Sequence, residues 1–598
     1  MPTHSTALDY VRVEVAFSSD PNTATPAFVD LTSRAFLSAG IDITRGRSEA
    51  SGEVQTGSCN LTLDNTDGAL SPMLASSPYY PNVKPQNRLR VTYRDPAVAG
   101  NLLAAEDASF EGATIGAWVA SSGVTLSNST TQAWDGTRSL QIDWSGSLKA
   151  VHVPVSGLVV GRTYVWSVYV YVGGFTGSSV GAGVLGIGTG ATRSSWNNTW
   201  GRLSYTFTAT SHTHFVVVST VSTTTRTDYL DGAMLDEGIA LATFTTDPPP
   251  IAYRFDGYVD EWPIQWPNGG DNDSRSTVRA FDLQSRLSRS RILESVIAET
   301  YRLDSPGWHF PLGESSESTS AGDRSGTGST LAVTQVNTGG ELSFGAGTGP
   351  GTDGAAAPTF TPVDRYNGLY LLGVAPEVNP LGRHRTLSAV ALSSTLQHQC
   401  IVEWSDMYGI GIILGTNSSG NAVAKWTNPW DTSKNVTVTS ANVDADGRTH
   451  TFAATLSNDG AGTSTLRLYV DGIERGTAAT FTTAASGYIL PPLRRISVGG
   501  TAFGDMFTGT ISHVAGYGSA LTTLADHHAA ASTGFAGDRS DERIERIASW
   551  LGLPADLLEL DAGLSTVGHS DPTGKSAWQA MQECADAEAG ALFIGTTG

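Results

Sequence analysis

The sequence predicts a mainly β protein of several domains, with a small helical part near its C-terminal end. Charged residues make up 16% of the chain and hydrophobic residues 40%, and 67 glycines lie among short apolar runs. This composition is typical of β proteins rich in turns. With 598 residues, the chain is too long for one compact core, because a domain usually has about 150 residues. Apolar residues recur at every second position from Val11 onward, which is the period of half-buried strands.

Charge and cysteine content exclude several classes of protein. The formal net charge is −21, which argues against binding to nucleic acid or to anionic membranes, since like charges repel. The odd number and wide spacing of Cys59, Cys400 and Cys584 exclude a disulfide framework and a cysteine-rich zinc site. No segment approaches the ~20 apolar residues of a membrane span, and the first ten residues do not resemble a signal peptide. We therefore expect a soluble protein whose partners are neutral or cationic.

Residues 1–95 are predicted to form a small β domain. One strand is expected to have a face made of Val11, Val13, Val15 and Phe17. The run Cys59-Asn-Leu-Thr-Leu alternates in the same way, and the residues up to Gly68 suit a tight turn.

Residues 96–248 are predicted to form a separate domain of two packed sheets. The composition shifts to Ser, Thr, Gly and aromatic residues near Asp95 and ends at a proline run that cannot continue a central strand. The strand near residues 163–172 is expected to bury Tyr164, Trp166, Val168, Val170 and Val172.

The rest of the chain divides into three predicted segments. Residues 249–300 combine short strands with a helix around Leu283 and Leu287, and β character returns in residues 301–533. Residues 534–598 are expected to hold one helix capped by Ser540 or Asp541, a second capped by Asp571, and a strand at 591–594. Because a chain rarely ends one strand after a helix, we expect a partner chain or further residues to complete this part.

No catalytic constellation is found. The stretch from Gly568 to Ser576 has five residues between its glycines, where a phosphate-binding loop needs four. Glu403 and Asp406 are three residues apart, so a strand would place them on opposite faces. No His-Glu-x-x-His is present, and Cys584 has no histidine base beside it in the sequence. An enzyme is therefore the less favoured hypothesis.

Carbohydrate binding is better supported. The face opposite the core of the strand 163–171 carries Tyr169 and Tyr171, which would project away from the other sheet. Aromatic rings on an open sheet can stack on the apolar faces of sugars, and Trp196 could add a ring from a loop. The alternative is that these rings cover an interface with a neighbouring domain or subunit.

Most of residues 101–247 resembles carbohydrate-binding modules of the jelly-roll type. The resemblance rests on four motifs in order: Phe110-Glu-Gly, Trp134-Asp-Gly-Thr-Arg-Ser-Leu-Gln-Ile, Gly161-Arg-Thr-Tyr-Val-Trp-Ser-Val-Tyr-Val and Asp228-Tyr-Leu-Asp-Gly-Ala-Met-Leu-Asp-Glu-Gly. It implies a structural calcium held by Glu111 and Asp231, for which oxygen ligands are suitable. The sugar is not specified.

Residues 301–533 resemble a laminin-G or concanavalin-like jelly roll. The resemblance rests on the motifs Phe310-Pro-Leu-Gly-Glu, Asp446-Gly-Arg-Thr-His-Thr-Phe, Leu468-Tyr-Val-Asp-Gly and Phe507-Thr-Gly-Thr-Ile-Ser-His-Val-Ala-Gly-Tyr. Lectins, structural modules and hydrolases share this fold, so it does not specify a function.

The three remaining segments resemble minor tail proteins of long-tailed phages of actinobacteria, whose framework is related to baseplate hub and distal tail modules. The motifs are Thr44-Arg-Gly-Arg-Ser, Gly57-Ser-Cys-Asn-Leu-Thr-Leu-Asp-Asn-Thr-Asp-Gly, Ser77-Pro-Tyr-Tyr-Pro-Asn-Val-Lys-Pro, Phe255-Asp-Gly-Tyr-Val-Asp-Glu-Trp-Pro and Gly574-Lys-Ser-Ala-Trp-Gln-Ala-Met.

This resemblance implies a structural component of the virion tail tip. In this hypothesis a discontinuous framework of 1–95, 249–300 and 534–598 assembles with distal tail, tape measure and other minor tail proteins. The family implies a homotrimer, and the two inserted sandwiches would bind host cell-surface glycans, with avidity from several copies. Two alternatives stay open: a cell-wall polysaccharide depolymerase, and sandwiches that are purely architectural.

Overall fold

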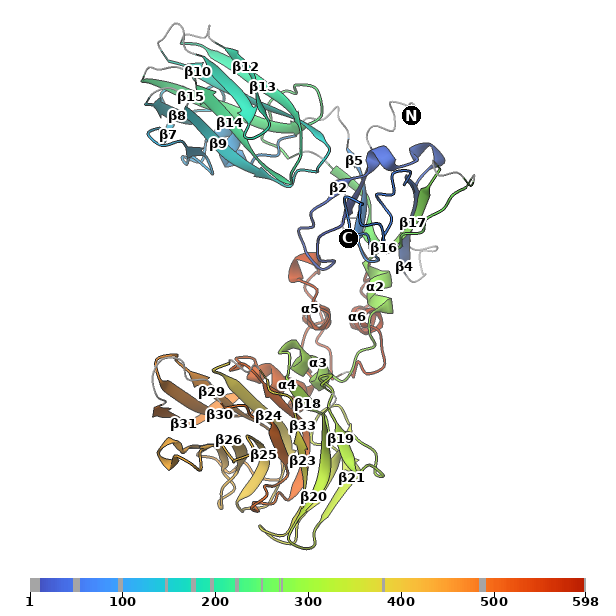
Figure 1. Cartoon of the computed structure of the whole chain (residues 1–598), viewed down its shortest axis with the longest axis vertical. Coiled ribbons are helices and arrows are strands. Elements are labelled where there is room, and N and C mark those ends of the chain that lie inside the picture. Colours follow the sequence, from blue (N-terminus) through green and yellow to red (C-terminus); the bar gives the residue numbers. More distant parts are fainter. Residues whose placement is uncertain are drawn as a thin grey trace. The chain divides into compact units, whose positions relative to one another are not determined.

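The computed structural model divides the chain into two compact units, Met1–Leu287 with Phe593–Gly598, and Ser288–Leu592 (Figure 1). It describes residues 11–46, 54–94, 100–145, 149–173, 179–193, 198–220, 225–248, 251–267, 269, 273–327, 329–378, 382–482, 491–569 and 571–595. The predicted fold class, mainly β with sandwich domains and a few C-terminal helices, is confirmed.

The first unit contains a seven-stranded antiparallel sheet, which we call the framework sheet. Its order is β2-β1-β5-β16-β17-β4-β3. The strands are β1 (Val11–Ala16), β2 (Val29–Asp30), β3 (Asp42–Gly46), β4 (Gln55–Asp64), β5 (Arg88–Arg94), β16 (Ile251–Glu261) and β17 (Arg275–Phe281), with short 3-10 turns at Thr32–Arg34 and Leu37–Ala39. Strands from both ends of the unit pair directly, since β17 lies against β4 and β16 against β5. The helix α2 (Leu283–Arg289) follows β17.

Apolar residues at every second position of these strands form the core of the framework sheet. Val13, Val15 and Phe17 are buried as predicted, and so are Cys59, Leu61 and Leu63 on β4. The turn after β4 is closed by Asn65, whose side-chain oxygen accepts a hydrogen bond from the backbone N–H of Leu70 at 2.7 Å.

Between β5 and β16 the chain forms a sandwich of two five-stranded sheets, which we call the first sandwich. One sheet has the order β13-β10-β15-β8-β7 and the other β12-β11-β14-β9-β6. Its elements are α1 (Ala105–Ser109), β6 (Val119–Ala120), β7 (Thr125–Ser129), β8 (Ser139–Trp144), β9 (Lys149–Ser156), β10 (Thr163–Val172), β11 (Val180–Val184), β12 (Gly188–Arg193), β13 (Trp200–Thr208), β14 (Thr213–Thr220) and β15 (Arg226–Glu237).

The core of the first sandwich confirms the predicted alternation on β10. The predicted core residues Tyr164, Trp166, Val168, Val170 and Val172 are all at most 2% exposed. They pack between the two sheets with residues of β8, β9 and β14. The opposite face of β10 is therefore left for other contacts.

A buried ion-pair network joins the first sandwich to the framework sheet. Arg162, next to β10, pairs with Glu14 at 3.2 Å, Asp30 at 3.0 Å and Glu237 at 3.0 Å. Glu14 and Asp30 belong to β1 and β2, and the backbone N–H of Asp30 also donates to the carbonyl of Val160 at 3.4 Å. Burial disfavours the charged guanidinium, but the three carboxylates outweigh this effect and raise the pKa of Arg162.

The second unit contains a larger sandwich, which we call the second sandwich. One sheet has the order β21-β22-β33-β24-β29-β30-β31, with β18 paired to β33, and the other β19-β20-β23-β32-β25-β26-β27-β28. The strands of the first sheet are β18 (Trp308–Phe310), β21 (Glu341–Thr348), β22 (Ala356–Thr361), β24 (Arg385–Leu392), β29 (Thr449–Asn458), β30 (Thr463–Val470), β31 (Ile473–Thr482) and β33 (Gly509–Tyr517). Those of the second are β19 (Ser320–Gly322), β20 (Thr330–Val336), β23 (Gly368–Val374), β25 (Gln399–Ser405), β26 (Gly411–Thr416), β27 (Ala422–Thr427), β28 (Val436–Thr439) and β32 (Arg495–Val498).

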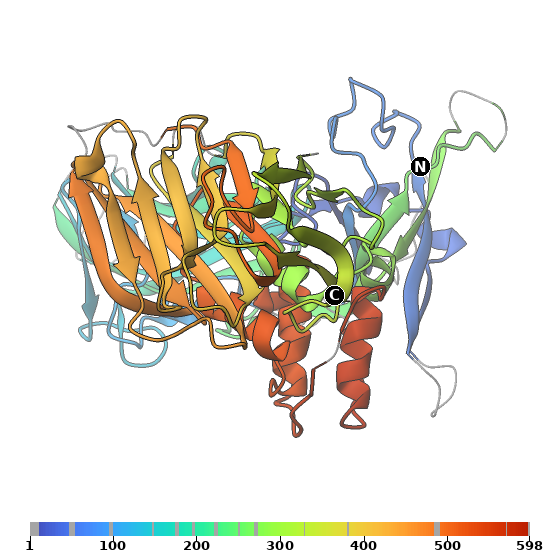
Figure 2. The ribbon, with the colours of Figure 1, turned by 90° about the horizontal axis from the view of Figure 1, so that it is seen from below.

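The helices of the second unit are α3 (Val296–Leu303), α4 (Leu524–Thr533), α5 (Ser540–Trp550) and α6 (Ala577–Asp586), with 3-10 turns at Thr432–Lys434 and Ala555–Leu557. The helices α5 and α6 lie side by side (Figure 2).

Both predicted helix caps were wrong. The helix α5 is capped by Arg539, whose backbone N–H donates to Glu542 at 2.8 Å. The helix α6 is capped by Ser576 and not by Asp571, because Ser576 pairs reciprocally with Gln579 in a capping box. Ser576 thus has a structural role in the stretch that resembles a phosphate-binding loop. Residues 591–595 form no strand, so the strand predicted there was also wrong.

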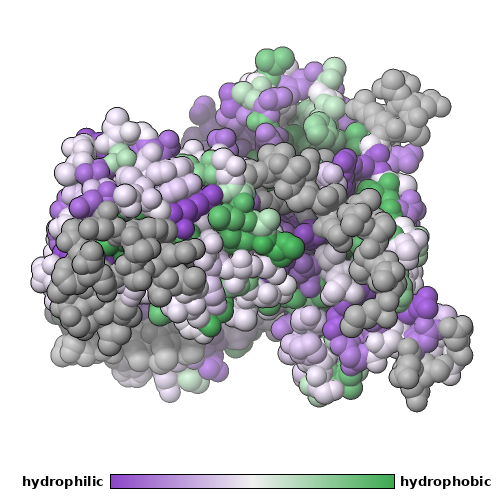
Figure 3. Space-filling model, turned by 90° about the horizontal axis from the view of Figure 1, so that it is seen from above, coloured by the Kyte–Doolittle hydropathy of each residue, from purple (hydrophilic) through white to green (hydrophobic). Residues whose placement is uncertain are grey.

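On the face shown in Figure 3, hydrophilic residues dominate and hydrophobic residues gather in small groups. Such groups are normal on folded proteins. Within the described residues, no helix is both long and apolar enough to cross a membrane.

A buried histidine cluster joins the helices of the second unit to the second sandwich. The ring of Tyr301 on α3 stacks on His527 of α4, with centroids 4.2 Å apart, and lies 5.3 Å from His309 on β18. Nε2 of His309 lies 3.3 Å from Nδ1 of His513 on β33. Burial, together with the nearby His513, His527, Arg302 and Arg324, lowers the pKa of His309 well below its usual value.

The depressed pKa of His309 predicts acid sensitivity of the second unit. The folded state keeps His309 neutral, whereas the unfolded chain takes up a proton below about pH 6.5. The contribution of His309 to stability is therefore full above that pH and is lost as pH falls toward the folded pKa, by up to about 1.4 kcal/mol per pH unit. We expect faster hydrogen exchange in β18 at pH 5 than at pH 7.5, after correction for intrinsic rates. His309→Gln should reduce this difference between the exchange rates at pH 5 and pH 7.5, whereas His398→Gln, in a loop, should leave it unchanged. An equal pH dependence of exchange in the wild type and in His309→Gln would refute the role of His309 in acid sensitivity.

Candidate functional site

The outer face of the sheet β13-β10-β15-β8-β7 carries a row of aromatic side chains. Cross-strand register aligns Tyr171 of β10 with Trp200 of β13 on one side and with Tyr229 of β15 on the other. Ring centroids are 5.7 Å apart for Tyr171 and Trp200 and 5.9 Å apart for Tyr171 and Tyr229, in edge-to-face geometry. All three rings are half-buried, because their edges pack on one another and part of each ring faces outward. We call Trp200, Tyr171 and Tyr229 the aromatic row.

Polar side chains continue the aromatic row on β8. Gln141 lies opposite Tyr229 in the register and donates from Nε2 to Oδ2 of Asp143 at 3.1 Å. Thr227 of β15 donates from its hydroxyl to Oδ1 of Asp143 at 2.6 Å. Stacking surfaces and fixed hydrogen-bonding groups therefore lie next to each other on one sheet face.

Tyr169 lies on the same face but is covered. Trp134, from the loop between β7 and β8, stacks on Tyr169 with centroids 3.5 Å apart and planes 13° apart. Arg202 of β13 lies 5.3 Å from the centre of the Tyr169 ring and donates to the hydroxyl of Ser167 at 2.9 Å. Gly232 permits this stacking, since its φ is +53° and an added Cβ would lie 2.8 Å from Trp134 and 3.0 Å from Tyr169. Trp134 itself is half-buried and also contacts Phe244 edge-to-face, with centroids 5.5 Å apart. Trp134 and Phe244 therefore extend the aromatic surface beside the covered Tyr169.

Two carboxylates hold the loop that carries Trp134. Oδ2 of the buried Asp231 accepts from the backbone N–H groups of Trp134 at 2.8 Å and Asp135 at 3.0 Å. Oε1 of Glu111 accepts from the backbone N–H groups of Thr137 at 2.9 Å and Arg138 at 2.8 Å. Glu111 and Asp231, the two predicted calcium ligands, therefore bind the same loop from its two ends.

The electrostatics at this loop are unusual. Asp231 is fully buried, and in the described part of the chain no basic side chain bonds to it. Burial raises the pKa of Asp231 to about 6, against the effect of its backbone hydrogen bonds. No group of three or more His, Cys, Asp or Glu side chains suited to a metal is found among the described residues. Calcium binding stays a prediction.

The structure brings together some of the residues predicted for glycan binding and adds others. Tyr169 and Tyr171 lie on the outer face of β10, as alternation requires, while Trp196 lies outside the described residues. Alternation on β13 and β15 could also have identified Arg202 and Tyr229, which neighbour the core residues Leu203 and Leu230, and Trp200, which lies two residues before Arg202 on the same face. Trp134 lies on a loop, where no periodicity applies.

The two carboxylates weighed for catalysis in the second sandwich have structural roles. Glu403 is buried on β25 and accepts from the hydroxyl of Ser405 at 2.6 Å. Asp406 closes the hairpin after β25 by accepting from the backbone N–H groups of Tyr408 and Ile410, both at 2.8 Å.

Comparisons with known proteins give one family match and several similar folds. Residues 386–524 match the family model of the concanavalin A-like lectin/glucanases superfamily, which agrees with the predicted laminin-G or concanavalin-like jelly roll. None of the curated proteins matches the chain by sequence.

Several solved structures resemble parts of the chain. One is the C-terminal family 22 carbohydrate-binding module from Clostridium thermocellum, at 20% identity over 24% of this chain and 98% of that one, with a TM-score of 0.21. Another is domain 4 of an extracellular arabinanase from Geobacillus stearothermophilus in complex with arabinotriose, at 15% identity over 37% of this chain and 98% of that one, with a TM-score of 0.26. A third is tailspike protein 4 of bacteriophage CBA120, at 12% identity over 23% of this chain and 21% of that one, with a TM-score of 0.19.

Proposed function

We propose that the first sandwich binds a neutral glycan through the outer face of its sheet β13-β10-β15-β8-β7. The main support for this proposal is the aromatic row. Trp134 lies on the same sheet face, and Gln141 and Asp143 provide polar groups beside the row. Sugar rings have apolar faces that stack on aromatic rings, and their hydroxyls pair with carboxylates and amides. The net charge of −21 disfavours polyanionic glycans.

A glycan array probed with the full chain tests this function. We expect binding to neutral oligosaccharides and weak or no binding to sulfated or uronic-acid polymers. Selective retention on acidic glycans, or no retention on any glycan, would contradict the proposal.

The runner-up function is a depolymerase located in the second sandwich. Its basis is the match of residues 386–524 to a superfamily that includes glucanases. A reducing-sugar assay on purified bacterial cell walls separates the two functions. Steady release of sugar by the full chain would favour the depolymerase, whereas binding without release supports the proposed function.

We further propose that the chain is a structural component of a phage tail tip. Three of the motifs that resemble minor tail proteins begin on strands of the framework sheet: 44–48 on β3, 57–68 on β4 and 255–263 on β16. The motif 77–85 lies in the loop before β5. The partners would be distal tail, tape measure and other minor tail proteins, and the assembly would be a homotrimer.

Electron cryo-microscopy of particles that carry this chain should show three copies at the tail tip. A capsid location or a single copy would contradict this.

Calcium is proposed as a structural ion of the first sandwich, held by Glu111 and Asp231. The fit rests on the chemistry of the donors: two carboxylates that bind the same loop, one of them fully buried without a basic partner among the described residues. Oxygen ligands of this kind suit calcium. We expect EGTA to lower the melting temperature of the first unit by several degrees, and calcium in excess to restore it. Asp231→Asn should abolish this response, and an unchanged melting temperature of the wild type in EGTA would overturn the proposal.

A further inference from the structure

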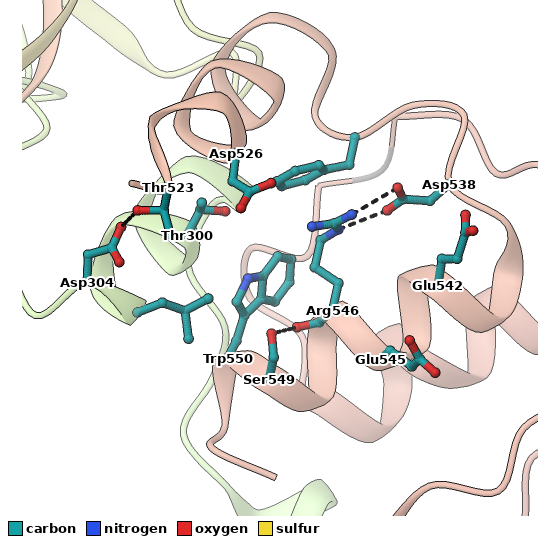
Figure 4. A pocket seen from close by; sticks show the side chains of 12 residues that line it. Thr300, Asp304, Thr523, Asp526, Asp538, Glu542, Glu545, Arg546, Ser549 and Trp550 are labelled. Atoms are coloured by element: carbon teal, nitrogen blue, oxygen red, sulfur yellow. Dashed lines mark hydrogen bonds and ion pairs between the residues drawn. The ribbon is translucent and has the colours of Figure 1, made fainter. Parts of the chain in front are cut away.

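A pocket of about 640 Å³ lies among α3, α4 and α5 of the second unit, away from the sheets of the second sandwich (Figure 4). Its apolar lining consists of Leu303, Phe535 and Trp550, and its other lining side chains are polar or charged. This volume lies within the range of ligand-binding clefts, about 300–1,000 Å³. No residue of this pocket takes part in the proposed glycan site.

The charged lining of this pocket is predominantly acidic. Five carboxylates and one guanidinium line it. Three of the carboxylates already have partners: Asp304 bonds to His527, Asp538 to Arg543 and Arg546, and Glu542 to Arg539.

Two carboxylates of the pocket lining form no ion pair within the part of the chain that the structure describes. They are Asp526 and Glu545, both of which are exposed. The single guanidinium, that of Arg546, is already used, since it pairs with Asp538 at 2.9 Å and lies 3.6 Å from the centre of the Phe535 ring. The pocket thus has negative charge that no group of its own neutralises.

The buried side chain of Trp550, which also lines this pocket, has an unpaired hydrogen-bond donor among the described residues. Its side chain is 6% exposed, and its indole Nε1 has no hydrogen-bond acceptor among the described residues. Figure 4 shows the indole in the middle of the ring of lining side chains, with its nitrogen on the side of α3. Leu303, the apolar lining residue on α3, is 49% exposed. A buried indole N–H usually has a partner, so this donor indicates a missing acceptor.

We propose that this pocket binds a basic segment of a partner polypeptide. A peptide meets all three requirements together: its carbonyl accepts from Nε1 of Trp550, the alkyl stem of an Arg or Lys packs on Leu303 and the indole, and its cationic head reaches Asp526 and Glu545. A polyamine supplies cations but no acceptor. A neutral glycan supplies acceptors but no cation, and nucleic acid is repelled by the acidic lining. This proposal goes beyond glycan binding and does not depend on it.

Fluorescence anisotropy with the full chain tests the proposal. The probe is a fluorescein-labelled peptide, Gly-Arg-Leu-Arg-Gly with an amidated C-terminus, and Gly-Glu-Leu-Glu-Gly is the charge-reversed control. We expect the basic peptide alone to bind. The double variant D526N/E545Q should weaken this binding about fivefold by loss of charge pairing. Trp550→Phe, which keeps the ring and removes the donor, should weaken it about fivefold as well.

A charge-matched variant separates a site from general attraction to an acidic protein. The double variant D556N/E559Q removes the same charge from exposed residues outside the pocket and should bind the peptide as the wild type does. An equal loss in this control would overturn the proposal. So would unchanged binding in Trp550→Phe together with full displacement of the peptide by an equal concentration of spermidine.

Discussion

Replacing Arg162 by methionine is expected to lower the free energy of unfolding of the first unit by about 3 kcal/mol, because it removes the cation that three shielded carboxylates share. Glu14 keeps Arg90 as a partner at 2.5 Å and Glu237 keeps Arg12 at 3.3 Å, whereas Asp30 loses its ion pair with Arg162. Glu14 is fully buried, and Asp30 and Glu237 are largely shielded from solvent. Water therefore cannot replace their contacts with Arg162 at low cost. Methionine keeps much of the apolar stem, which isolates the effect of the charge. Chemical denaturation of the full chain, followed by hydrogen exchange in β1 and β10, measures the change.

Arg34→Met is the matched control for this prediction. Arg34 pairs with Asp67 at 2.7 Å, but the Asp67 side chain is 55% exposed, so the pair is worth at most about 1 kcal/mol. If both variants lose the same stability, the Arg162 network does not hold the first sandwich to the framework sheet in the way described.

Replacing Tyr171 by alanine is expected to weaken glycan binding by about 10- to 30-fold, since it removes the central ring of the aromatic row. Tyr171 contacts both Trp200 and Tyr229, so its loss also frees the two neighbouring rings. Tyr171→Phe keeps the stacking surface and should retain most of the affinity. Isothermal titration of the full chain with the best oligosaccharide from the array gives these numbers.

A tyrosine in the second unit provides the control for Tyr171→Ala. Tyr408 is 60% exposed at the tip of a hairpin in the second sandwich, next to Trp430. Tyr408→Ala should leave the affinity unchanged. A loss there as large as in Tyr171→Ala would move the binding site to the second sandwich.

The fold class could be predicted because β structure repeats locally. Alternation on β10 identified its core residues, since each second side chain must enter the space between the sheets. The caps of α5 and α6 were harder to predict. Several polar residues lie near each helix start, so the sequence does not single out Ser576 for α6. The cap of α5, Arg539, makes no side-chain hydrogen bond to the backbone at the helix start and therefore lacks the usual sequence signal of a cap.

The candidate site could be predicted only in part. Tyr171 follows from the period of one strand, but its alignment with Trp200 and Tyr229 depends on strand pairing between distant segments. The stacking of Trp134 on Tyr169 depends further on a loop fixed by Glu111 and Asp231. Long-range contacts of this kind leave no periodic pattern in the sequence, so a ring that looks free on its strand can be covered in the fold.

Hydrogen exchange of the full chain, with and without the oligosaccharide that binds best on the array, tests the glycan site most directly. The proposed site predicts slower exchange in β10, in β15 and in the loop that carries Trp134, with no change in β25 to β28 of the second sandwich. Protection confined to the second unit, or none in the first sandwich at saturating oligosaccharide, would contradict it.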